Sequence, residues 1–249
     1  MRNLDQYLIV LVSVVLGVSA KYPSDLPRCK AGDTECLPKV ITQVIRTVKN
    51  GRPDMNLGSI EPLHIDKVDI SQGGNSPIQI TLNFRDQDLY GISSAEVTKV
   101  VGFEKDPRTS KFEIEAKVPK LSLSGKYKVN GQVLVLPIQG RGRSNLTIEN
   151  VVLRIKFKPK VIEKNGKNYI QTDKFKLTFD TTRLYLNLDN LFNGDKALGD
   201  NMNAFLNENW KVVLDELKPA CIEAFAQIFA SIINSIFSKL SYDDVFEAS

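Results

Sequence analysis

Few residues of this 249-residue chain could carry out acid–base or nucleophilic chemistry. The chain has one histidine, His64, and three cysteines, Cys29, Cys36 and Cys221. A lone histidine in a strand-like segment is more often a surface or hydrogen-bonded core residue than a catalytic base. No nucleophile elbow, HExxH motif, P-loop or dinucleotide-binding glycine motif occurs. Paired carboxylates from distant segments leave a glycosidase open, but we expect no enzyme, no resident metal and no cofactor.

The cysteines indicate an oxidising compartment. Cys29 and Cys36 enclose a short polar loop in which Gly32 and Asp33 favour a turn, so we expect a local disulfide. A metal site is the alternative, but His64 would have to join two widely spaced thiolates. Cys221 lies among apolar residues and is expected to be a free, buried thiol, with an intermolecular disulfide as the alternative.

The N-terminal segment, residues 1–20, is typical of a secretory signal peptide. Arg2 precedes a nearly unbroken apolar run from Tyr7 to Val18, and small residues permit cleavage after Ala20. The run is too short for a comfortable membrane anchor. We therefore expect a secreted, extracellular protein whose residues 21–249 form a single domain. Asn145-Leu146-Thr147 is an N-glycosylation sequon, which secretion would make available for modification.

The charge of the chain argues against a basic patch that would bind nucleic acid. The net charge is only +4, and basic residues alternate with apolar ones, as in Arg154-Ile155-Lys156-Phe157-Lys158. That alternation is typical of a solvated strand face. The oligomeric state is left open by the sequence.

The body of the chain changes from helical to strand periodicity. Leu37 to Val48 has apolar residues at helical spacing, whereas 78–188 alternates between apolar and polar residues in several runs. This pattern predicts a large antiparallel sheet that is covered on one face. Asn130-Gly131 and Asn165-Gly166 indicate tight hairpins, and we expect Gly140-Arg141-Gly142-Arg143 to form a turn or bulge.

A long apolar helical tract, from about Asp195 to Leu240, follows the sheet. The centre of its apolar face moves by roughly a third of a turn across Pro219. The helix therefore either breaks or kinks at Pro219, or continues with different sides buried along its length. In both cases we expect the tract to be buried on more than one side. We expect no stable membrane insertion, because the run from Ala224 to Phe237 is short and contains Gln227 and Asn234.

Several motifs resemble the takeout / juvenile-hormone-binding-protein family of secreted insect proteins over nearly the whole mature chain. The motifs are Leu26-Pro27-Arg28-Cys29, Cys36-Leu37, Leu191-Phe192-Asn193-Gly194-Asp195-Lys196, Phe205-Leu206-Asn207-Glu208-Asn209-Trp210 and Glu216-Leu217-Lys218-Pro219. The resemblance implies an α+β fold in which a long C-terminal helix is wrapped by a strongly curved antiparallel sheet of the tubular lipid-binding type, with a short N-terminal helix. It also implies an internal hydrophobic tunnel.

The resemblance implies carriage of a small lipophilic ligand, such as a terpenoid, a fatty-acid-like molecule or another long apolar molecule. Hormone-binding members use a tyrosine hydroxyl as a polar handle, for which Tyr127 is the candidate here. The expected tunnel-wall residues are Phe84, Phe103, Tyr127, Val133, Val135, Phe205, Trp210, Val213, Leu217, Phe225, Phe229 and Ile233. For each, ordinary core packing is the competing interpretation.

Two other functions remain open from the sequence. The protein could be a secreted signalling protein that acts through a cell-surface receptor, with any ligand structural. It could also hydrolyse lipid esters, in which case one side chain would be indispensable for turnover.

Overall fold

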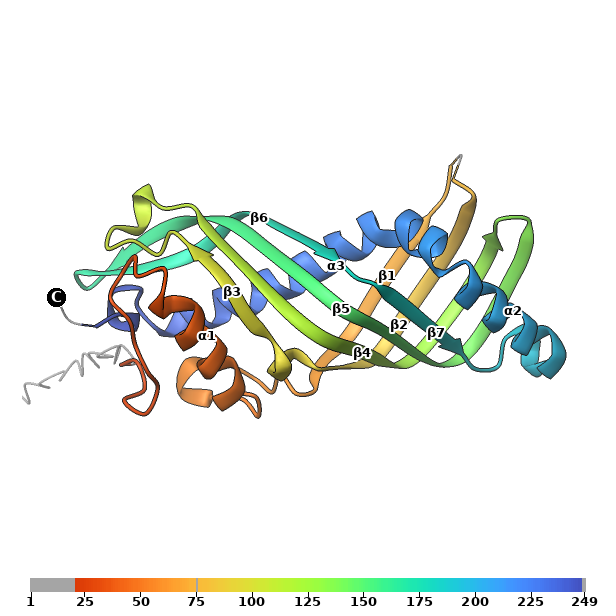
Figure 1. Cartoon of the computed structure of the whole chain (residues 1–249), viewed down its shortest axis with the longest axis horizontal. Helices are drawn as coiled ribbons and strands as arrows, with labels where there is room; N and C mark the ends of the chain where they lie inside the picture. Colours follow the sequence, from red (N-terminus) through yellow and green to blue (C-terminus); the bar gives the residue numbers. More distant parts are fainter. Residues whose placement is uncertain (1–20, 75, 248–249) are drawn as a thin grey trace, which may run out of the picture.

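The computed structural model describes residues 21–74 and 76–247. The expected signal peptide therefore lies outside the described residues. Within them, a seven-stranded antiparallel sheet curls along an elongated molecule. The long helix α3 (Trp210–Lys239) runs lengthwise along the open side of this sheet (Figure 1). The predicted fold class is confirmed.

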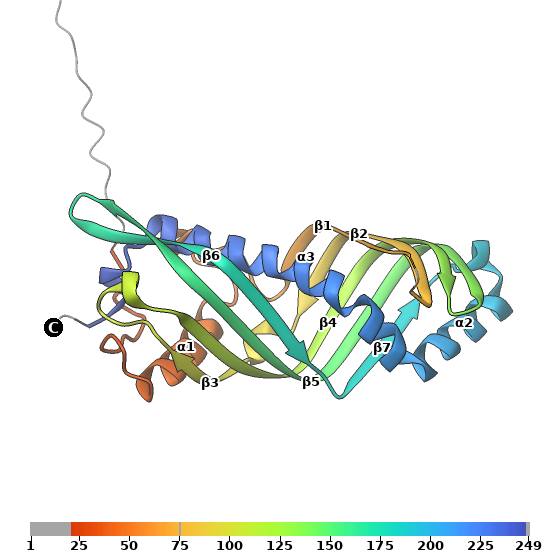
Figure 2. The same ribbon diagram turned by 90° about the horizontal axis from the view of Figure 1, so that it is seen from above.

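The sheet has the strand order β1-β2-β4-β5-β6, with β3 paired to β4 and β7 paired to β5. The strands are β1 (Leu63–Gln72), β2 (Ile78–Tyr90), β3 (Glu96–Val101), β4 (Phe112–Val133), β5 (Leu136–Lys164), β6 (Lys167–Asp180) and β7 (Arg183–Leu188). The two long strands β4 and β5 run through the whole sheet. They carry β3 and β6 along one half and β1, β2 and β7 along the other (Figure 2).

A corner joins the two halves. In β4 the buried side chains occupy even positions up to Val118 and odd positions from Leu123 onward. The switch falls at Pro119, which cannot donate a ladder hydrogen bond. On β5, the neighbouring Asn150 has a positive φ of 51°. Both strands thus change face at the same place, and this change lets one sheet wrap around α3.

One of the two predicted hairpins is confirmed. Asn165 and Gly166 form the turn between β5 and β6, with φ values of 51° and 73°. The prediction for Asn130-Gly131 is wrong, because these residues lie within β4 and the turn falls at Leu134 and Val135. At Gly131, a Cβ atom would lie 2.0 Å from the carbonyl oxygen of Gln79, so the glycine permits close strand approach rather than a turn.

The prediction of a turn or bulge at Gly140-Arg141-Gly142-Arg143 is also wrong. The run pairs with β4 without a register shift. A Cβ on Gly142 would lie 2.5 Å from the carbonyl oxygen of Asp189, and one on Gly140 would lie 2.8 Å from Leu191. The glycines therefore let the segment after β7 pack directly on the inner face of β5.

The long helix continues through Pro219, so the continuous alternative is correct. Proline removes the hydrogen bond that residue 219 would donate to the carbonyl of Asp215. Both residues are exposed, which leaves that carbonyl open to water. The helical tract instead changes direction at Asn209, between α2 (Lys196–Glu208) and α3.

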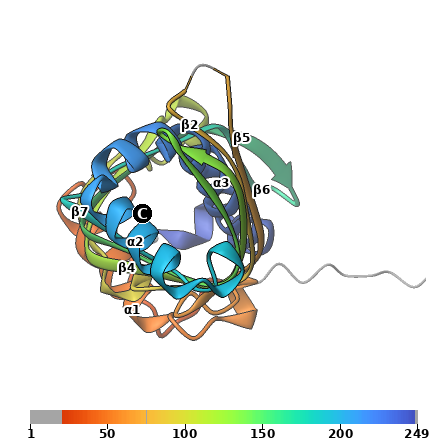
Figure 3. The same ribbon diagram turned by 90° about the vertical axis from the view of Figure 1, so that its right-hand side faces the viewer.

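By length and composition α3 could cross a membrane, with a mean hydropathy of 1.6 over its most apolar window. The sequence argument that the apolar run is too short was therefore wrong. In the fold, α3 contacts β1 and β6, the two ends of the strand order, and so closes the open side of the sheet. Figure 3 shows the sheet and helices surrounding a common axis. None of the residues in this apolar window is fully buried, and the exposed residues of α3 include a row at four-residue steps, Asp215, Pro219, Glu223, Gln227 and Ser231, so one side of the helix faces solvent.

The end of the molecule near α1 (Cys36–Thr47) is filled by aromatic side chains. The ring centroids of Phe103 and Phe112 lie 4.2 Å apart, and Phe112 also contacts Phe157 and Tyr242. The predicted Cys29–Cys36 disulfide is present beside this cluster. The disulfide lies at the start of α1. The predicted bounds of this helix, Leu37 to Val48, differ from the observed ones by one residue at each end.

Candidate functional site

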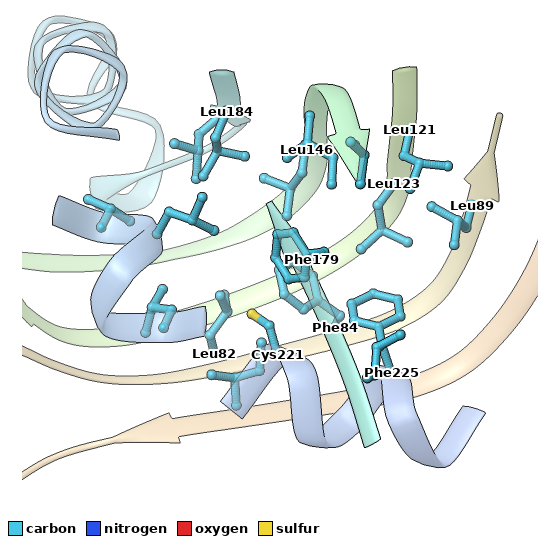
Figure 4. Close-up of a pocket in the computed structure, with 18 of the residues that line it drawn as sticks. Leu82, Phe84, Leu89, Leu121, Leu123, Leu146, Phe179, Leu184, Cys221 and Phe225 are labelled. Atoms are coloured by element: carbon cyan, nitrogen blue, oxygen red, sulfur yellow. The ribbon is translucent and has the colours of Figure 1, made fainter. Parts of the chain in front are cut away.

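A cavity of about 180 Å³ lies between α3 and the inner face of the sheet. Figure 4 shows Cys221 and Phe225 of α3 with Phe84, Phe179 and Leu184 around this space. Strand alternation brings the wall together, because inward-facing residues of several strands meet α3 across the curled sheet. The wall residues are Ile70, Leu82, Phe84, Leu89, Leu121, Leu123, Leu146, Ile148, Val151, Leu153, Leu177, Phe179, Leu184, Leu186, Leu188, Val213, Leu214, Leu217, Cys221, Phe225 and Phe229.

The chemistry of this wall is almost wholly hydrocarbon. Its one heteroatom-bearing side chain is Cys221, a free cysteine. Burial raises the pKa of the Cys221 thiol to about 11, because the thiolate would lose its hydration. Among the described residues Cys221 has no disulfide partner, and the residue is half-buried rather than fully buried. An internal site of this kind favours apolar ligands and offers a charged ligand no partner.

Charged residues lie just outside the cavity where α3 meets β6. Lys218 Nζ lies 5.2 Å from the ring centroid of Phe179, a wall residue, and 3.3 Å from Asp180. Arg154 pairs with the same carboxylate at 2.7 Å. Hydrogen bonds from Arg154 and then Lys218 lower the pKa of Asp180. The lysine stem and this ion-pair network thus cover Phe179 from the solvent side.

Asparagine side chains from the helices complete the open edge of the sheet on either side of this junction. The side-chain amide of Asn203 on α2 accepts a hydrogen bond from the backbone N–H of Leu188 and donates one to its carbonyl oxygen. Asn207 on α2 does the same with the backbone of Leu186, and all four distances are 2.7–3.0 Å. Asn234 of α3 accepts from the Thr172 backbone N–H at 2.7 Å. These amides replace a neighbouring strand along the edges of β6 and β7.

Several residues predicted for the tunnel wall lie on the cavity wall. They are Phe84 on β2 and Val213, Leu217, Phe225 and Phe229 on α3. Val133 is buried in the core around the cavity, and Phe205 packs against that core, but neither contributes to the wall.

Other predicted wall residues lie elsewhere. Val135 is in the β4–β5 turn and is 83% exposed, because the hairpin turns later than its Asn-Gly pair predicted. Phe103 belongs to the aromatic cluster at the α1 end, and Ile233 packs against that cluster. Trp210 lies at the start of α3, and the Arg183 guanidinium carbon lies 5.6 Å from the centroid of the Trp210 ring. These four residues form no part of the cavity wall.

Tyr127 is buried, but its hydroxyl is already used within the protein. It donates a 2.7 Å hydrogen bond to the carbonyl oxygen of Asp189. Burial raises the pKa of this phenol to about 12. In this structure Tyr127 fastens the segment after β7 to β4 and is absent from the cavity wall.

Sequence reasoning missed most of the wall, in which leucines on β2, β4, β5, β6 and β7 are the commonest residues. The alternation of apolar and polar residues along each strand identifies these leucines as inward-facing. It does not tell which inward-facing residues of different strands meet around one space. A usable signal was that these stripes carry mainly leucine, while the stripes that fill the α1 end carry phenylalanine.

Among the described residues, no three His, Cys, Asp or Glu side chains are grouped as metal ligands. His64 is on the surface, with Nδ1 2.9 Å from an Asp88 carboxylate oxygen. That hydrogen bond raises the pKa of His64. Neither residue of this surface contact belongs to the cavity wall.

Comparison with known proteins places the chain in a family. The sequence profile described as "Haemolymph juvenile hormone binding protein (JHBP)" matches residues 7–247. The chain belongs to the takeout / JHBP family. A relative from Drosophila melanogaster, "Circadian clock-controlled protein daywake", is 30% identical over 96% of this chain and 94% of its own length. The Drosophila yakuba protein of that name is 26% identical over 97% of this chain and 94% of its own length.

A solved structure of the same takeout / JHBP type has this fold. Takeout 1 from Epiphyas postvittana aligns with a TM-score of 0.77 and 25% identity, over 89% of this chain and 99% of its own. The resemblance stated from the cysteine and C-terminal motifs is therefore confirmed.

Proposed function

We propose that this takeout / JHBP family member is a secreted carrier that binds a small lipophilic ligand in its internal cavity. The observation that carries the proposal is the hydrocarbon wall between α3 and the sheet, in which the Cys221 thiol is the single polar side chain. Apolar space that is lined in this way is typically dry, and an apolar ligand gains free energy by leaving water for it. The name of the family, which refers to binding of juvenile hormone, supports the same ligand class.

The size of the cavity bears on the ligand. A volume of about 180 Å³ exceeds the ~150 Å³ apolar cavity that accepts benzene. It is below the ~300–1,000 Å³ of ligand pockets in general. A terpenoid or fatty-acyl chain would therefore need the leucine and phenylalanine side chains of the wall to change rotamer. Burial of each CH₂ contributes about 0.8 kcal/mol, so about ten buried methylenes would correspond to roughly micromolar affinity before ordering costs.

Secretion is part of this proposal. The leader pattern of residues 1–20 and the Cys29–Cys36 disulfide both fit an oxidising, extracellular setting. Asn145 of the glycosylation sequon is exposed on the outer side of β5, so an attached glycan would point away from the cavity.

The test is displacement of an apolar fluorescent probe by terpenoids and fatty acyl chains, with one variant that fills the cavity. Cys221→Phe adds a ring inside the wall, whereas Val212→Phe adds the same ring at a position of α3 that is 43% exposed. We expect Cys221→Phe to lower probe and ligand affinity at least tenfold and Val212→Phe to leave them unchanged. Equal binding by both variants, or no displacement by any ligand in a folded protein, would refute binding in this cavity.

A further inference from the structure

The outer face of β4 and β5 carries basic residues directly opposite one another. Lys126 pairs with Arg143, and Lys128 pairs with Arg141, in the β4–β5 register. All four side chains are exposed. Like charges at opposed positions of an antiparallel pair repel each other and destabilise the sheet. We call these four residues the cationic face.

Most of the cationic face has no compensating acid. Lys126 forms an ion pair with Asp86 at 2.7 Å. Among the described residues, no carboxylate lies within ion-pair distance of Lys128, Arg141 or Arg143. On the other half of β5, Arg154 and Lys156 pair with acids, whereas the exposed Lys158 and Lys160 pair with none of the described acids.

The same strands end in exposed apolar residues. Val135 and Leu136, at the β4–β5 turn, are 83% and 37% exposed. Helix α2 lies at this end of the molecule (Figure 1), and Leu198 in its first turn is 52% exposed. A basic surface with exposed apolar side chains at one end is complementary to an anionic bilayer. The apolar side chains can enter the acyl region, and the basic side chains can contact the anionic head groups.

We propose that the cationic face, with the apolar end formed by Val135, Leu136 and Leu198, docks the protein on an anionic lipid surface. The strands β4 and β5 would lie along the surface, so that the basic side chains and the hairpin tip reach it together. The alternating glycines of Gly140-Arg141-Gly142-Arg143 place no side chain on the inner face, so both arginines of this run point outward. This interface involves none of the cavity-wall residues and does not depend on an occupied cavity.

The test is co-sedimentation with vesicles of phosphatidylcholine containing about a third phosphatidylserine, compared with pure phosphatidylcholine vesicles. We expect binding to the anionic vesicles alone, and release by high salt. The triple variant Lys128→Gln/Arg141→Gln/Arg143→Gln should bind about a hundredfold more weakly, since each basic residue near an anionic surface contributes about a fivefold factor. Val135→Ser/Leu198→Ser should weaken binding to the same vesicles while leaving its salt dependence intact.

Matched variants separate this interface from charge and folding effects. Lys158→Gln/Lys160→Gln/Lys176→Gln removes the same charge from exposed positions of β5 and β6, and it should keep vesicle binding. Arg141→Lys/Arg143→Lys keeps the charge and should also bind. Because removal of opposed like charges relieves repulsion, the thermal midpoint of the test variant should not fall. An equal loss of vesicle binding in both triple variants would overturn the proposal. So would a wild-type protein that is retained on a heparin column but does not bind anionic vesicles.

Discussion

At the residue scale, Tyr127 and Cys221 each have a different role in the structure from the one that their residue types indicate. Tyr127, the expected polar handle, bonds the backbone of Asp189. Cys221, expected only as a core thiol, contributes the single sulfur atom of the cavity wall. The sequence predicts burial of Cys221 from its apolar neighbours, and it offers Tyr127 as a tunnel residue only through the family resemblance. It could not predict which of them faces the cavity, since that depends on the curvature of strands far apart in the chain.

Cys221 should be unreactive toward polar thiol reagents in the native protein. Burial raises its thiol pKa to about 11 from a usual value of 9.0, so at pH 8 the thiolate fraction should be about a hundredfold lower than in the unfolded chain. Because the neutral form is favoured, the reaction should accelerate with each pH unit until about pH 11. Kinetics with a chromogenic disulfide reagent measure this. A native rate equal to the rate in denaturant would show that the thiol is not enclosed.

Replacement of Tyr127 by phenylalanine tests the two roles that its hydroxyl could have. The change removes the 2.7 Å hydrogen bond to the Asp189 carbonyl. We expect the free energy of unfolding to fall by about 1 kcal/mol, with ligand affinity unchanged. Chemical denaturation and probe titration measure the two quantities. A large loss of affinity at unchanged stability would return Tyr127 to the role of ligand handle.

At the element scale, the helices act as substitutes for missing strands. Asn203 and Asn207 of α2 bond the edge of β7, while α3 covers the rest of the opening. Periodicity predicted α1, α3 and most strands, because each has a continuous apolar face. It failed at Asn130-Gly131, since a glycine needed for close strand approach has the same sequence signature as a turn. The edge amides were also invisible, because asparagine in a helix is commonly just an exposed residue.

Replacement of Asn207 by alanine should loosen the edge of β7. The change removes its two hydrogen bonds to the backbone of Leu186, at 2.7 and 3.0 Å. We expect a loss of about 2 kcal/mol in the free energy of unfolding and faster amide exchange at Leu186. Asn201→Ala, at an exposed position of α2, provides the control and should cost much less. Equal stability of the two variants would show that the edge amides are dispensable.

At the scale of the whole molecule, a curled sheet and one long helix enclose space that neither could enclose alone. The aromatic cluster fills the α1 end, and the leucine-lined middle is left open as a cavity. The sequence predicted the architecture, because strand and helix patterns follow each other without interruption and the C-terminal motifs are specific. It did not predict where along the helix the space would lie, since that follows from how side chains of different size meet across the sheet.

The central claim is that the cavity holds an apolar molecule. The most direct test is native mass spectrometry of the protein purified from its native source, followed by organic extraction and identification of what is released. We expect a stoichiometric mass increment that disappears on denaturation, and a lipophilic compound in the extract. A folded protein without such an increment, which also fails to take up terpenoids and fatty acids added in excess, would contradict the carrier function.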